Sequence, residues 1–211
     1  MPIRGLSPDD VAATALRLVD EGGLPDFTMR RLAAALGVQP SAIYWHYPNK
    51  QTLLAELADR IIGSRRQSIP HDAWSARLRE EAIALREALL AYRDGAEIVS
   101  STMALGLGSD IATSRLVDAL ATGPFDSAAT RHAAATVLHF ILGHVSLEQQ
   151  RMLYDSLGAR EGAPVLLSDA SGSEGFRFGI DTIIDGLEVR ASEESSSASG
   201  VEKTQPITSE P

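Results

Sequence analysis

The 211-residue chain has no cysteine and no long hydrophobic run. Without cysteine it forms neither disulfides nor thiolate metal sites, so a reducing, cytoplasmic compartment is expected. No stretch approaches the roughly 20 apolar residues that span a bilayer. The first ten residues lack the apolar segment of a signal peptide, so no membrane partner is expected. Strand-like alternation of apolar and polar residues is almost absent, which predicts an all-α fold.

Negative charge exceeds positive charge by 9, which argues against a nucleic-acid partner for the chain as a whole. The charges are unevenly distributed, however. Residues 28–50 contain Arg30, Arg31 and Lys50 and no acidic residue, a local charge of +3. Residues 191–211 contain four glutamates and one lysine, a local charge of −3. The basic segment therefore remains a candidate DNA-binding surface.

Capping residues and apolar periodicity predict helices throughout the chain. The expected N-terminal helices start after Ser7, after Thr28, near Gln39 and near Asn49. Further helices are expected over Trp74–Tyr92, Ile98–Leu107, Asp110–Leu120, Ser127–Gln150 and Glu174–Arg190. Gly63–Asp72 reads as a hinge and Gly158–Gly172 as a loop. We therefore expect a three-helix helix-turn-helix domain over residues 1–63, a larger helical ligand-binding and dimerisation domain over 64–190, and a disordered tail over 191–211.

The segment Thr28–Leu54 has the pattern of a helix-turn-helix. Two short helices meet at Gly37, which can adopt the left-handed conformation of a tight bend. The second helix offers amide, hydroxyl and apolar groups suited to base edges in a major groove. A plain helical hairpin with surface aromatics would explain the apolar positions but not the aromatic run Tyr44–Tyr47. Within that run, we expect Trp45 and Tyr47 to pack under the next helix.

The sequence LAAALGVQPSAIYWHYPNKQTLL resembles the signature of the TetR family of repressors. Residues 88–96, 139–143 and 176–188 look like the regulatory domain of its tetracycline-repressor branch, so the resemblance covers about residues 6–190. It implies a homodimeric repressor that binds a palindromic double-stranded DNA operator and is released by a small-molecule effector. The family's phosphate contacts then fall on Thr28, Tyr44, His46 and Lys50. Its base contacts fall on Arg30, Gln39, Pro40, Ser41 and Ala42.

The resemblance also implies an effector pocket. Its residues would be Arg66, Glu81, Leu85, Val99, Thr102 and His139. The tetracycline-repressor branch holds its effector through magnesium, and the metal-linked positions fall on Val99 and Leu147, which cannot ligate a hard cation. No metal site and no cofactor are therefore expected, and the effector should differ from magnesium-tetracycline. His132, His139 and His144 also lack the i, i+4 spacing of a helical metal pair.

The last predicted helix has one continuous apolar stripe. It contains Phe176, Gly179, Ile180, Ile183 and Leu187. Together with Phe140 and Gly143 of the preceding helix, this stripe is expected to form an intersubunit four-helix bundle. Two alternatives remain: a DNA-binding regulator without a small-molecule effector, and a helical enzyme on the same fold. The second lacks any recognisable nucleophile, base or cofactor motif.

Overall fold

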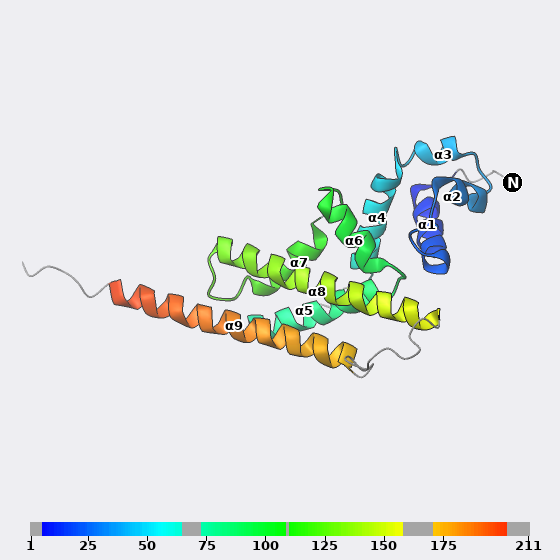
Figure 1. Cartoon of the computed structure of the whole chain (residues 1–211). Helices are drawn as coiled ribbons and strands as arrows, with labels where there is room; N and C mark the ends of the chain where they lie inside the picture. Colours follow the sequence, from blue (N-terminus) through cyan, green and yellow to red (C-terminus); the bar gives the residue numbers. More distant parts are fainter. Residues whose placement is uncertain (1–5, 65–72, 109, 158–170, 202–211) are drawn as a thin grey trace, which may run out of the picture.

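The computed structural model describes residues 6–64, 73–108, 110–157 and 171–201, and within these ranges all regular structure is α-helical (Figure 1). The helices are α1 Pro8–Gly22, α2 Met29–Leu36, α3 Pro40–Tyr44, α4 Lys50–Gly63, α5 Trp74–Leu90, α6 Gly95–Ala104, α7 Ile111–Leu120, α8 Ser127–Ser156 and α9 Ser171–Val201. The expected all-α class is confirmed.

Local signals explain where the first helices begin and end. Ser7 and Asp10 form a reciprocal capping box at the start of α1, which ends at Gly23 with φ 81°. The Thr28 hydroxyl accepts a hydrogen bond from the Arg31 amide and caps α2. Gly37, with φ 66°, then ends α2 in the left-handed conformation and directs the chain into α3.

The four N-terminal helices share a small apolar core. Val11 of α1, Leu32 of α2, Ile43 of α3 and Leu53 of α4 are all fully buried. The C-terminal half of α4 continues this core into the rest of the protein, where it packs against α5, α6 and α7. Helix α4 is therefore a continuous connection between the helix-turn-helix and the larger helical body (Figure 1).

Two helices are longer than the sequence pattern predicted. Helix α8 continues to Ser156 and α9 to Val201. The prediction of a disordered tail is therefore wrong for residues 191–201, and the side chain of Ala191 is buried. Extending an existing helix costs much less than nucleating one, so a polar, proline-free segment can continue α9. The rest of the tail, Arg66 with most of the expected hinge, and most of the expected loop lie outside the described residues.

The apolar stripe of α9 is largely used inside the protomer. Phe176, Ile180 and Ile184 are each 1% exposed and belong to the core. A Cβ on Gly179 would overlap the Phe140 ring, so this glycine brings α9 close to α8 of the same chain. Phe176 and Ile180, which the sequence assigned to the subunit contact, are instead core residues of the protomer. The helical periodicity of the apolar residues does not show whether the same chain or a second subunit covers them.

Candidate nucleic-acid interface

The short helix α3 is held from one side and open on the other. Ile43 anchors it in the core with no exposed surface. Gln39 and Ser41 are exposed, and Pro40 and Ala42 are partly exposed. The expected base-reading groups of α3 therefore lie on an accessible surface, and Arg30 on α2 is exposed as well.

The residues expected to contact phosphates differ in their exposure and in the contacts that they make. Tyr44 is 47% exposed and His46 is partly exposed. The Lys50 ammonium donates a hydrogen bond of 2.8 Å to the Phe27 carbonyl and lies 5.4 Å from the centre of the Phe27 ring. Lys50 thus ties the start of α4 to Phe27, the residue before the α2 cap Thr28, a structural role that the sequence pattern did not predict.

The two aromatic residues assigned to the core have opposite positions. Tyr47 is 6% exposed, as expected, whereas Trp45 is 89% exposed, so the prediction for Trp45 is wrong. Trp45 follows the anchoring Ile43 by two residues, which is about 200° around an ideal helix and therefore away from the core. The two-residue spacing from Ile43 would have predicted the exposed position of Trp45.

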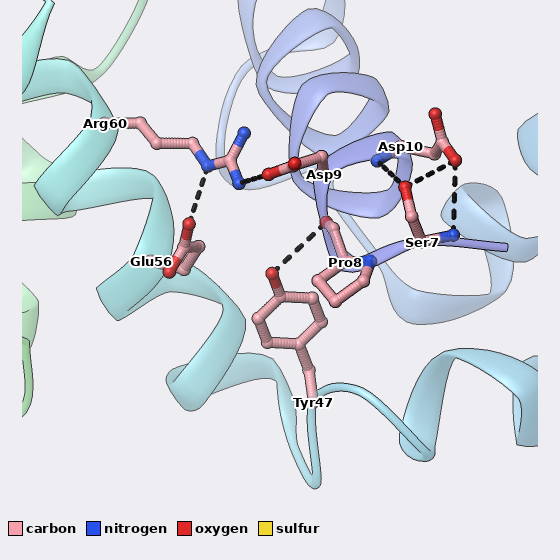
Figure 2. A network of polar contacts seen from close by, with 7 residues as sticks. All are labelled: Ser7, Pro8, Asp9, Asp10, Tyr47, Glu56 and Arg60. Atoms are coloured by element: carbon pink, nitrogen blue, oxygen red, sulfur yellow. Dashed lines mark hydrogen bonds and ion pairs between the residues drawn. The ribbon is translucent and has the colours of Figure 1, made fainter.

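A polar network fixes the base of the helix-turn-helix (Figure 2). The Tyr47 hydroxyl donates to the Pro8 carbonyl over 3.3 Å. The Arg60 guanidinium binds the Asp9 carboxylate at 2.5 Å and the Glu56 carboxylate at 2.7 Å. Burial, with the nearby Glu56 carboxylate second, raises the pKa of Tyr47 above its ordinary value. The network holds the start of α1 against α4, next to the turn that follows α3.

We predict that Tyr47→Phe lowers the free energy of unfolding by about 1 kcal/mol at neutral pH, because the hydrogen bond to Pro8 is lost. The raised pKa of Tyr47 implies stability that is fully present below about pH 10 and is lost as the pH rises through the folded-state pKa. Urea unfolding at pH 8 and pH 11 should therefore show a steeper alkaline loss for the wild type than for the variant. Tyr44→Phe, at a half-exposed site, is the control, and equal alkaline losses for wild type and Tyr47→Phe would contradict the prediction.

Of the residues expected to form the effector pocket, those that the structure describes do not line a common open cavity made of described residues alone. Leu85, Val99 and Thr102 are buried, and the Thr102 hydroxyl donates to the carbonyls of Ile98 and Val99. Among the described residues, the cavity that Val99 and Thr102 line has a volume of only about 20 Å³.

Two of the expected pocket residues have other surroundings. His139 is exposed on α8, outside the buried stripe of that helix, and does not border the cavity that Val99 and Thr102 line. The Glu81 carboxylate accepts a hydrogen bond from the Arg115 guanidinium, which also donates to the Ile62 carbonyl at the end of α4. The sequence pattern did not single out Arg115.

Within the described parts of the chain, no three His, Asp or Glu side chains are grouped so as to hold a metal ion. None of the helices described there is long and apolar enough to cross a membrane.

An exposed short helix, α3, packed with α1, α2 and α4 and joined through α4 to a larger helical body, defines a helix-turn-helix protein with a further C-terminal domain. The profile of bacterial regulatory proteins of the tetR family matches residues 11–57, and that of the tetracyclin repressor-like C-terminal domain matches residues 68–173. The chain belongs to the TetR family of bacterial regulators.

Similar proteins include tetracycline repressors and solved TetR-family structures. The class E tetracycline repressor of Escherichia coli is 32% identical over 198 residues, covering 89% of this chain and 93% of that protein. Mycobacterium smegmatis BioQ is 38% identical with a TM-score of 0.76, covering 86% of this chain and 97% of BioQ. A TetR variant from Acinetobacter baumannii AYE, crystallised with minocycline, is 30% identical with a TM-score of 0.70, covering 88% of this chain and 98% of that one.

Proposed function

We propose that this protein is a homodimeric transcriptional repressor that binds a palindromic DNA operator and is released by a small-molecule effector. Residues 1–63 would bind DNA and residues 64–190 would form the regulatory and dimerisation domain. The observation that carries the proposal is the exposure of Gln39 and Ser41 on a recognition helix anchored by Ile43. Such a helix docks its polar side into a major groove.

Comparison with a DNA-bound relative supports this proposal. BioQ has been crystallised with its double-stranded DNA operator, and that chain is 37% identical with a TM-score of 0.71, covering 86% of this chain and 98% of BioQ. We propose the corresponding docking for α3, with base contacts from Arg30 and residues 39–42. Phosphate contacts would come from Thr28, Tyr44, His46 and Lys50.

A groove between α8 and α9 supports the homodimer. Its volume is about 600 Å³. It is lined by Phe125, Asp126, Ala128, Ala129, His132, Ala133 and Thr136 on one side and by Thr182, Ile183, Gly186, Leu187 and Arg190 of α9 on the other. Ile183 and Leu187 are only partly buried in the protomer, and Gly143 is exposed. A second copy packing here would bury these positions and form a four-helix bundle. A two-fold dimer in turn requires an operator with two-fold symmetry.

Substitutions on the DNA-facing surface separate positioning from base reading. We expect Tyr44→Phe to weaken binding to all sequences alike, because a phosphate contact carries no sequence information, and to leave the salt dependence nearly unchanged, because no charge is removed. We expect Arg30→Ala and Gln39→Ala to relax discrimination at particular base pairs by about 1–3 kcal/mol each. An operator selected from a random DNA pool, followed by anisotropy titrations over a salt series, measures both effects. A change of base preference in Tyr44→Phe would contradict the assignment.

The effector should act without magnesium. Val99 offers no lone pair, and Leu147 is a 56% exposed apolar side chain on α8. Titrating the operator complex with tetracycline, with and without Mg²⁺, should therefore give no release, while a class E tetracycline repressor tested in parallel serves as the reference. Tight, Mg²⁺-dependent release from this protein would refute the proposed pocket chemistry.

One observation favours a regulator without a small-molecule effector as the second candidate. The cavity at Val99 and Thr102 has room for about one water molecule. A ligand that binds at this cavity would have to open it, and it can do so only by binding the open state more tightly. If a diverse panel of apolar small molecules neither raises the melting temperature nor releases the operator, the second candidate is favoured.

A further inference from the structure

We propose that Asp94 and Asp20 are positioning residues for operator binding, which hold the α1–α2 turn against the α5–α6 turn. This junction connects the DNA-binding part to the regulatory part at a place separate from α4. The proposal rests on the proposed function for its effect on DNA, but the junction itself can be measured without DNA.

The two turns exchange hydrogen bonds reciprocally. The Leu24 amide of the α1–α2 turn donates to the Asp94 carboxylate over 2.7 Å. The Arg93 amide of the α5–α6 turn donates to the Asp20 carboxylate near the end of α1 over 3.0 Å. Each side therefore supplies one carboxylate and one backbone N–H. Hydrogen bonds to an ionised acceptor are about twice as strong as neutral ones.

Asp94 gives up local stability to make its contact. Among the described residues it is the one non-glycine with a positive φ, 57°. It also occupies the N-cap position of α6, where an aspartate ordinarily accepts a hydrogen bond from its own helix, yet it makes no such bond. Its carboxylate instead reaches Leu24, 70 residues away in the chain. Strain combined with an unused cap is typical of a functional position.

The opposite side of the junction requires glycine. Gly23 has φ 81°, and a Cβ there would lie 3.2 Å from the Asp94 carboxylate and 3.3 Å from the Arg93 side chain. A cleft of about 250 Å³ borders the contact, between the α1–α2 turn and α8. The two hydrogen bonds lie beside this cleft and link the two turns directly.

Helix α8 holds the α5–α6 turn through the hydrogen bonds of one side chain, Gln149. The Gln149 side-chain amide donates to the carbonyls of Leu89 and Tyr92 over 3.0 and 2.8 Å, and its oxygen accepts from the Ala96 amide over 3.2 Å. Helix α8 also lines the α8–α9 groove. A shift of α8 is therefore passed through Gln149 to the turn that holds Leu24, without passing through α4.

The first test measures the junction in the full-length protein without DNA. Because the chain has no cysteine, Ala34→Cys on α2 and Ser100→Cys on α6, both at exposed positions, can take a fluorescent donor and acceptor specifically. The donor–acceptor distance distribution should be narrow in the otherwise wild-type chain and should broaden in Asp94→Gly, which removes the carboxylate and tolerates the positive φ. Asp20→Ala should give the same result. Glu97→Gln, which removes an exposed carboxylate from α6, is the control and should leave the distribution narrow.

The second test measures operator binding by the same variants. Asp94→Gly should bind the full palindrome about tenfold more weakly than the wild type, because two recognition helices must be held at a fixed separation to engage both half-sites. Its affinity for a single half-site should change less than twofold. An unchanged distance distribution, or a palindrome affinity equal to or tighter than that of the wild type, would overturn the proposal. If the wild type bound no palindrome, the proposed function would fail, whereas the distance measurement would still decide whether the junction positions the domain.

Discussion

Gly186→Arg is expected to be monomeric at micromolar concentration and to lose about 100-fold or more in operator affinity. Gly186 is exposed on α9, and apart from the adjoining backbone of its own helix no atom of the described residues lies within 4 Å of where its Cβ would stand. It lines the α8–α9 groove next to Ile183 and Leu187. An arginine therefore has room in a single protomer but occupies the space of a packed partner helix. Two linked half-site contacts exceed one by about 10²–10⁴ in affinity, and a monomer loses that gain.

Gly186→Ser is the matched control for this prediction. It makes a similar backbone change in the helix but leaves the groove open, so it should remain dimeric. Sedimentation velocity measures the oligomeric state, and anisotropy titrations compare a full palindrome with one half-site. Half-site affinity should be equal within twofold for both variants. A Gly186→Arg protein that still sediments as a dimer would show that the subunits meet elsewhere.

Signals within a few residues of each other predicted much of the fold. The caps at Ser7 and Thr28 and the left-handed turn at Gly37 act within one helical turn. In the structure, α1 begins after Ser7, and α2 begins after Thr28 and ends before Gly37, as these residues predicted. The exposed side of α3 follows from the same local logic, since Ile43 is its one buried residue. Short-range chemistry therefore predicted the recognition helix, even though the operator sequence does not follow from it.

Contacts between distant segments could not be read from the sequence. An apolar stripe shows that a helix face is covered but not by what, and Phe176 is covered by its own chain rather than by a partner. Only the tertiary fold brings Asp94 to Leu24, which lies 70 residues away in the chain. Glu81 was placed in the pocket by resemblance, whereas its ion-pair partner Arg115 had no sequence signal at all.

The Glu81–Arg115 pair lies inside the regulatory body, where the side chains are 17% and 9% exposed. Glu81 comes from α5 and Arg115 from α7, and a second guanidinium nitrogen donates to the Ile62 carbonyl of α4 over 2.6 Å. One side chain thus connects three helices, including the one that supports the recognition helix. A buried charge is tolerated because its partner and its hydrogen bonds replace the water that it lost.

Arg115→Met should therefore lower the free energy of unfolding by about 3–5 kcal/mol, because it leaves the Glu81 carboxylate buried without this partner. The double variant Arg115→Met with Glu81→Leu should recover much of that loss, since it removes both charges and fills similar volume with apolar atoms. Urea unfolding at one fixed protein concentration measures the single and double variants, because the stability of a dimer depends on concentration. If the double variant is as unstable as the sum of its two single variants, the residues are not coupled, and the pair does not stabilise the junction of α4, α5 and α7.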